Sequence, residues 1–349
     1  MKRNVGRSGA NLGSGGGAPL SDTEIGACKT MRLDTSSPDK ARASVKRAAE
    51  ILNAGGIVAF PTETVYGLGA RALDPVAVAA IFQAKGRPHD NPLIVHVDSL
   101  ETMEQLGVLD DRARALVRVM MPGPLTLVVR SRGVVPAIAL GGLETVALRI
   151  PDHPIARELV ALVGPLVAPS ANLSGRPSPT DADAVMTDLA GRIDAVIEGG
   201  PCRVGIESTV LDVRGETPII LRPGVITAEL LAVAMRVDPD SFARPDESAG
   251  KVGSPGTMYR HYAPTTPIVI VDPSQIPLDS GPRRFYLLAS HVRPDQITDS
   301  DLVQTLTEKT FYRLLREADR ESCDEIVVVA VVRDLPLGLR DRLTRAAGL

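Results

Sequence analysis

The sequence predicts an α/β protein of two domains. Short apolar runs typical of buried strands alternate with segments of helical periodicity over residues 35–236. A polar stretch rich in proline and glycine, residues 237–265, then interrupts the pattern and predicts a linker. The alternation starts again over residues 266–349, which predicts a second, smaller α/β domain. A length of 349 residues agrees with this division.

The composition is globular and argues against several classes of protein. Hydrophobic residues make up 44% of the chain, and no apolar run approaches the ~20 residues that cross a bilayer, so we expect no membrane contact. A net charge of −3 argues against a surface that coats nucleic acid, while a local basic cleft stays compatible with it. The scattered Cys28, Cys202 and Cys323 predict neither a disulfide framework nor a zinc site. We therefore expect a cytoplasmic protein.

Residues 1–30 are predicted to be a disordered extension. They contain GANLGSGGGAP and few large apolar side chains. Lys2, Arg3 and Arg7 give a basic start, but no apolar stretch follows, so a secretory signal is not indicated. A natural tail, a tag and a true start at Met31 all remain compatible with this pattern.

The elements of the first domain follow from caps, breakers and periodicity. Ser37 and Pro38 open a helix that runs to Asn53, where two glycines end it. Asp74 and Pro75 open another helix, which ends at Gly86. We expect further helices over 101–120, 154–162, 181–189 and 227–234, and strands over 57–60, 93–97, 125–129, 144–150, 165–168, 195–197, 208–213 and 218–221.

A loop dense in hydroxyl groups follows the strand at 57–60. It contains Thr62, Thr64 and Tyr66, and we expect Gly67 and Gly69 to let the backbone turn or approach a ligand.

Two cations stand at the end of the helix that begins at Pro75. Lys85 alone is most simply explained as a base that compensates the helix dipole. Arg87 weakens this explanation, because it lies in the turn beyond the helix. Two cations beside backbone N–H groups suit a polyanion such as a phosphate chain.

A second polar loop follows the apolar strand 165–168. Ser170, Asn172, Ser174 and Gly175 place small hydrogen-bonding groups after a strand, where open α/β sheets bind ligands. A plain capped turn between strand and helix explains them equally well. Arg222 likewise lies beyond its strand, either to reach a ligand or simply as a surface arginine at a turn.

Several common chemistries lack their residues in this chain. The one Gly-Lys pair, at 250–251, lies in the linker, so any nucleotide is bound without a P-loop. The five histidines do not pair at metal-ligand spacing, and His96, within a buried-looking strand, is more typical of a core histidine. Ser170 lacks the G-x-S-x-G elbow of a serine hydrolase.

The second domain carries no conspicuous chemical cluster. We expect strands over 268–271, 285–288 and 326–332 and helices over 307–319 and 337–347, and a role as lid, scaffold or docking domain. Tyr259, His261 and Tyr262 are unusual in a linker, and they either anchor it or cover a ligand.

Motifs spread along the chain resemble those of the YrdC family, closely in its long two-domain form. They are PTETVYGLG, FQAKGRP, NPLIVHV, PGPLTLV, APSANLSGRPSPT, ESTVLD, LRPG and SPGTMYRHYAP, in this order. The resemblance runs from about residue 35 to the C-terminus. It implies a YrdC-like twisted mixed open sheet with flanking helices, followed by a Rossmann-like C-terminal domain.

The resemblance also implies an activity, and with it a set of site residues. L-threonine, bicarbonate or CO2, and ATP with Mg2+ would give threonylcarbamoyl-AMP and pyrophosphate. That product serves the tRNA threonylcarbamoyl-transferase machinery; direct tRNA binding is left open. The catalytic residues implied are Lys85, Arg87, Ser170 and Asn172. The residues implied to bind ATP are Arg87, Asn91, Thr126, Ser170, Ser178, Arg222 and His261. Those implied to bind threonine are Thr64, His96, Arg149 and Thr209. Tyr259, His261 and Tyr262 are implied to form a lid, and no side chain is implied as a metal ligand.

The chain departs from the family pattern at one point, and its function has two other interpretations. The family linker usually has Met-Lys where this chain has Thr257 and Met258, which leaves the role of that lysine in doubt. An RNA-binding module is one rival, and an aromatic content of only 3% counts against it. Another is a different carbamoyl or amino-acid transferase on the same fold; the extra modules of such relatives are not visible in the sequence.

Overall fold

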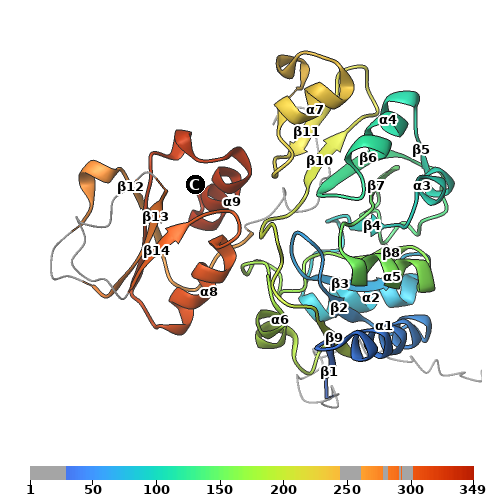
Figure 1. Ribbon diagram of the computed structural model, residues 1–349, viewed down its shortest axis with the longest axis horizontal. Coiled ribbons are helices and arrows are strands. Elements are labelled where there is room, and N and C mark those ends of the chain that lie inside the picture. Colours follow the sequence, from blue (N-terminus) through green and yellow to red (C-terminus); the bar gives the residue numbers. More distant parts are fainter. Residues whose placement is uncertain (1–28, 244–260, 278–281, 291, 293–301) are drawn as a thin grey trace, which may run out of the picture.

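The computed structural model describes residues 29–243, 261–277, 282–290, 292 and 302–349 (Figure 1). The described residues form two sheets, one in each predicted domain. The larger sheet has eleven strands, of which ten run in the order β1-β9-β2-β3-β8-β4-β7-β6-β10-β11, while β5 pairs with β6. The smaller sheet has the order β12-β15-β13-β14.

The strands and helices of the first domain have well-defined ends. The strands are β1 Met31–Asp34, β2 Val58–Phe60, β3 Gly67–Arg71, β4 Ile94–His96, β5 Gly107–Val108, β6 Leu125–Ser131, β7 Thr145–Arg149, β8 Leu166–Val167, β9 Ala195–Glu198, β10 Thr209–Asp212 and β11 Ile219–Arg222. The helices are α1 Pro38–Asn53, α2 Pro75–Lys85, α3 Leu100–Leu106, α4 Asp111–Met120, α5 Pro154–Val163, α6 Ala182–Leu189 and α7 Ala228–Met235.

The larger sheet is mixed, as the family resemblance implies. β9 pairs in parallel with β1 and β2, β4 pairs in parallel with β7, and β6 pairs in parallel with β10. β8 lies between β3 and β4 and is antiparallel to both. The chain that leaves β8 therefore runs beside the starts of β3 and β4, where an isolated bridge joins Ser170 to Gly67.

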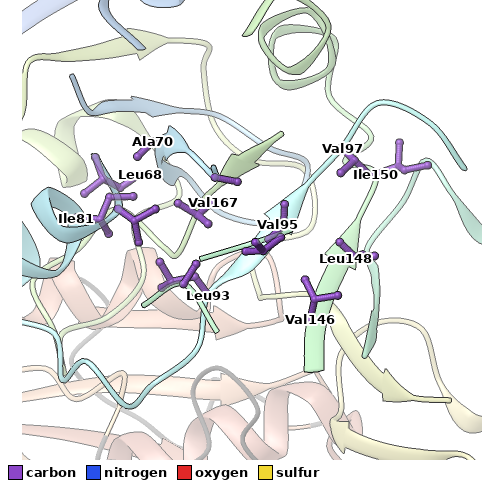
Figure 2. Close-up of a cluster of buried hydrophobic side chains, with 14 of the residues drawn as sticks. Leu68, Ala70, Ile81, Leu93, Val95, Val97, Val146, Leu148, Ile150 and Val167 are labelled. Atoms are coloured by element: carbon purple, nitrogen blue, oxygen red, sulfur yellow. The ribbon is translucent and has the colours of Figure 1, made fainter. Parts of the chain in front are cut away.

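Alternation along two central strands separates the core from the other face of the sheet. Leu93, Val95 and Val97 point into the main apolar core with Val146, Leu148 and Ile150 (Figure 2). Because successive side chains point to opposite faces, His96 of β4 and Arg149 of β7 lie on the opposite face. The register pairs these two residues directly. The two polar side chains are therefore neighbours on the face of the sheet that points away from the main core.

Two expectations for the first domain are wrong. The single helix predicted over 101–120 is two helices, α3 and α4, with β5 between them. A Cβ at Gly107 would stand 2.5 Å from Val129 Cγ2, so this glycine allows the chain to approach the sheet. Asp110 then starts α4 by accepting a hydrogen bond from the Ala113 N–H.

Gly67 and Gly69 lie in strand β3 and not in a turn. A Cβ at Gly69 would stand 2.5 Å from Phe60 Cε1, so the glycine makes room for the Phe60 ring on the neighbouring strand. Two further strands, β1 and β14, were not predicted. Thr30 is buried and donates a hydrogen bond to the Ile193 carbonyl, whereas residues 1–28 lie outside the described part.

The described residues of the second domain form a parallel sheet and two α-helices. Its elements are β12 Ile268–Val271, β13 Arg284–Ala289, β14 Val303–Leu306, β15 Glu325–Val329, α8 Phe311–Arg320 and α9 Leu337–Ala347. Every pair of adjacent strands is parallel. The strand predicted over 326–332 ends at Val329, and a short 3₁₀ helix over Val332–Asp334 follows.

The two domains share an apolar cluster. Val65 and Ile206 of the first domain and Tyr262 of the linker pack with Phe311 and Leu339 of the second. Figure 1 shows α8 and α9 on the side of the smaller sheet that faces the first domain. No helix among the described residues is both long and apolar enough to cross a membrane.

Candidate active site

A cavity of about 660 Å³, including the space at its open mouth, lies where the loops of the first domain meet the end of the linker. Most of the residues expected at the site line it: Thr64, Lys85, Arg87, His96, Arg149, Ser170, Asn172, Arg222, His261 and Tyr262. Segments far apart in the sequence thus converge on one partly open cavity.

Lys85 joins the two polar loops directly. Asp74 caps α2, and Gly86 ends it with a left-handed φ of 59°, which fixes the point where Lys85 leaves the helix. The Lys85 side chain is buried, and its Nζ donates to the Ser170 carbonyl at 2.6 Å and to the Asn172 carbonyl. Burial, with the Arg87 charge, holds the pKa of Lys85 well below its usual value. Lys85 therefore belongs to the cavity and does not simply compensate a helix dipole at the surface.

Arg87 and Arg222 add two further cations. Arg87 donates to the carbonyls of Asn91 and Pro92, at 3.3 and 3.0 Å. Arg222 donates from Nε and Nη2 to the Ser208 carbonyl, at 3.1 and 3.0 Å. Burial, with the Arg222 charge, lowers the pKa of Arg87 to about 10. Buried cations that lie close together favour a negatively charged neighbour.

A second polar group lies around Arg149. Its Nη2 is 2.7 Å from the Glu63 carboxylate and donates to Thr64 Oγ1 at 3.0 Å. His96 is its cross-strand neighbour, and burial, with the Arg149 charge, lowers the His96 pKa to about 3. The imidazole is therefore neutral at physiological pH. A fixed guanidinium, a hydroxyl and a neutral imidazole together suit a small amino acid with a free carboxylate and a hydroxyl.

Four residues expected to bind substrate do not line the cavity. Thr126 Oγ1 is 2.8 Å from Ser208 Oγ, and Thr209 Oγ1 donates to the Ile226 carbonyl. Ser178 donates to Glu207. Asn91 is fully buried, and within the described structure neither of its amide atoms has a hydrogen-bond partner. These side chains turn into the walls, and Tyr259 lies outside the described residues.

Glu207 lines the cavity and was missed from the sequence. Its carboxylate accepts hydrogen bonds from Ser178 Oγ at 2.6 Å, from Tyr312 OH at 2.9 Å and from Arg342 Nε at 2.7 Å. Burial alone would raise the pKa of Glu207, but Arg342 and then Arg222 hold it at about 2. A carboxylate at the start of the ESTVLD motif was the available signal. Two of its partners, Tyr312 and Arg342, lie more than 100 residues later in the sequence and gave no signal.

The end of the linker closes one side of the cavity. Tyr262, with a φ of 68°, packs against the Tyr312 ring at a centroid distance of 5.4 Å. The Arg342 guanidinium lies over the Tyr262 ring, 5.5 Å from its centroid. Burial, with the Arg87 charge, lowers the pKa of the neighbouring His261 to about 4. Side chains of the second domain thus hold the linker against the cavity.

The described residues offer no protein cage for a metal ion. Nowhere in the described part of the chain do three His, Cys, Asp or Glu side chains gather for one. Glu207 is the acidic side chain in the cavity wall, and its oxygens are engaged by Ser178, Tyr312 and Arg342.

The fold and the cavity define an α/β protein with a mixed sheet and a cavity lined by cations of the first domain and by the end of the linker. Family comparisons give a sharper assignment. The Sua5/YciO/YrdC family model, described as "Telomere recombination", matches residues 50–224. A second model, described as "Threonylcarbamoyl-AMP synthase, C-terminal domain", matches residues 226–348. The chain belongs to the Sua5/YciO/YrdC family, in its two-domain form.

Individual relatives agree along nearly the whole length. Threonylcarbamoyl-AMP synthase of Pyrococcus abyssi is 40% identical over 87% of this chain and 94% of its own. The Bacillus subtilis enzyme of that name is 38% identical over 91% and 96%. The crystal structure of P. abyssi Sua5 complexed with L-threonine superposes with a TM-score of 0.79 at 37% identity, covering 92% of this chain and 97% of the other. The fold prediction is thereby confirmed.

Proposed function

We propose that this chain makes threonylcarbamoyl-AMP and pyrophosphate from L-threonine, bicarbonate or CO2, and ATP. The observation that carries the proposal is the contact of Lys85 with the Ser170 and Asn172 carbonyls across one cavity. It brings together the two polar motifs that the sequence separates by 85 residues. The names of the relatives, and the threonine complex of one of them, support the same reaction.

We assign threonine to the Arg149 side of the cavity. Its carboxylate pairs with the guanidinium that Glu63 holds, and its hydroxyl contacts Thr64 or His96. The neutral imidazole of His96 accepts or donates a hydrogen bond there without repelling the amine. The amine is then free to react with the carboxylating group and form a carbamate.

We assign the triphosphate to Lys85, Arg87 and Arg222. In the second step a carbamate oxygen forms a bond to the α-phosphorus of ATP, and the bond to pyrophosphate breaks in line. This makes the chain a nucleotidyltransferase. The three cations offset charge that develops on the phosphate oxygens, and Mg2+ bound to the nucleotide supplies further charge neutralisation. No described carboxylate is needed as a nucleophile.

The setting and the partner follow from the product. A mixed anhydride with AMP is labile, so we propose that a tRNA-modifying transferase consumes it to form threonylcarbamoyladenosine at position 37. The buried thiol of Cys202 suits a reducing cytoplasm.

Pyrophosphate release in the absence of RNA tests the proposal. The protein should release pyrophosphate from ATP only when threonine and bicarbonate are both present, and ¹³C-bicarbonate should appear in the AMP product by mass spectrometry. Arg87→Ala should lower the rate by roughly 10²–10³-fold, as the loss of one preorganised charge does elsewhere. Threonine-independent release, or RNA binding with no ATP consumption, would refute it and favour the RNA-binding rival.

A further inference from the structure

The segment 170–178, here called the SxN loop, forms a large part of the cavity wall. Ser170, Asn172, Ser174, Gly175 and Arg176 all line the cavity. On the cavity side the loop is joined to Lys85 through two of its carbonyls. The placement of this loop therefore sets the shape of the proposed nucleotide site.

The second domain holds the far side of the SxN loop at Pro177. Arg316 of α8 donates to the Pro177 carbonyl. The same guanidinium makes two hydrogen bonds to Asp188, at 3.1 and 2.8 Å. The Asp188 side chain is fully buried, and its Oδ2 also accepts from the Leu173 N–H at 3.3 Å. One arginine thus fixes both ends of the stretch between Leu173 and Pro177.

A second anchor from the same domain reaches the end of the loop. Ser178 donates to Glu207, and the other bonds to that carboxylate come from Tyr312 of α8 and Arg342 of α9. The Arg342 side chain is completely buried. Between the two anchors, the N–H of Ala263 at the end of the linker donates to the Gly175 carbonyl at 2.9 Å.

On the proposed threonine side, the contact of the described residues with the second domain is apolar, through Val65 next to Thr64, and the hydrogen bonds of Arg149 stay within the first domain. Arg149 is held by Glu63, Thr64 and the Gly123 carbonyl, all in the first domain. Hydrogen bonds from the second domain therefore converge on the SxN loop and Glu207, near the proposed triphosphate. Because the hydrogen bonds from the second domain lie near the proposed ATP side only, losing one of them should change ATP binding and threonine binding to different extents.

We propose that Arg316, Tyr312 and Arg342 are positioning residues that hold the SxN loop in the geometry that binds ATP. The inference rests on the proposed function, since it assigns the second domain to the ATP half of that site. A shift of about 1 Å in a positioning element can lower rates by about 10²-fold. Loss of an anchor should therefore weaken ATP binding strongly and threonine binding little.

Full-length Arg316→Met tests this, with Arg313→Met as the matched control. Arg313 lies on the same helix, but it is exposed, and in the described structure it pairs with Glu317, one turn along. We expect Arg316→Met to raise the KM for ATP by about 10–100-fold, with the KM for threonine within about 3-fold and Arg316→Lys partly restoring ATP use. Arg313→Met should match the wild type.

Tyr312→Phe keeps the inference testable if Arg316→Met does not fold, because it removes one hydroxyl from Glu207 and leaves no charge unpaired. A folded Tyr312→Phe or Arg316→Met protein with the wild-type KM for ATP would overturn the proposal. An equal rise in both KM values, with a lower melting temperature, would do so too, since it indicates a merely structural role. ATP binding by calorimetry separates the two proposals: wild-type protein that binds ATP without releasing pyrophosphate refutes the function and still allows the anchors to be tested.

Discussion

Replacing Lys85 with methionine should separate catalysis from stability. The ammonium is buried and bonds to two backbone carbonyls, while methionine keeps an unbranched stem of similar length. The Ser170 and Asn172 carbonyls would each lose a donor, at about 1–3 kcal/mol apiece. Removing a buried charge relieves a desolvation penalty of several kcal/mol. Because these terms oppose each other, the free energy of unfolding should change by less than about 2 kcal/mol.

The effect on rate has no such compensation. Without the ammonium, the proposed triphosphate site loses one of its three cations, and the rate should fall by about 10²–10³-fold, or about 2.7–4 kcal/mol in the barrier. Threonine-dependent pyrophosphate release at saturating ATP measures the rate, and urea unfolding of the same preparation measures stability. Lys46→Met on the exposed face of α1 is the control. A folded Lys85→Met protein that turns over within 3-fold of wild type, as a rough limit, would refute the role given to this side chain.

Three further expectations concern substrate, pH and packing. Arg149→Lys loses the forked guanidinium and should raise the KM for threonine by at least about 10-fold while changing the KM for ATP little, as steady-state kinetics would show; an unchanged threonine KM contradicts the assignment. The folded pKa of His96 is about 3, against about 6.5 when unfolded, so the unfolded state binds more protons in this window and stability falls as pH drops from about 6.5 to 3. His96→Gln should flatten that part of the stability–pH profile, and an unchanged slope counts against a buried neutral imidazole. Gly69→Ala places a Cβ 2.5 Å from the Phe60 ring and should lower the free energy of unfolding by about 1–3 kcal/mol, seen as a lower melting temperature. Gly215→Ala, whose Cβ would have its nearest neighbour at 3.6 Å, should leave the melting temperature unchanged.

Capping residues and glycines in the sequence predicted the ends of helices correctly. The start of α2 at Asp74 and Pro75, and its end at Gly86, were read correctly because capping and left-handed conformations depend on single residues. Strand β3 was missed because GLGAR lacks the β-branched residues typical of strands. Gly69 of this strand makes room for the Phe60 ring, a contact that sequence alone does not reveal.

Some contacts of the candidate site could be predicted from the sequence, and others could not. Lys85 and Ser170 were expected to meet, and they do, because each lies in a motif dense with polar residues beside an apolar strand. The partners of Glu207 could not be predicted, since Tyr312 and Arg342 lie in segments with ordinary helical composition. Thr126 and Thr209 were expected at the cavity, but the pleat of their strands and nearby acceptors turn them inward.

The order of strands in the larger sheet has a consequence for how this chain is made. β9 lies between β1 and β2, and β8 lies between β3 and β4, so strands translated late fill gaps between strands translated early. A nascent chain on the ribosome exposes the edges of β1 and β2 until Ala195–Glu198 emerges. Such edges template aggregation. Until residue 198 is made, the nascent chain therefore contains strands that lack their partners, and a message cut short within that interval yields a product with unpaired strands.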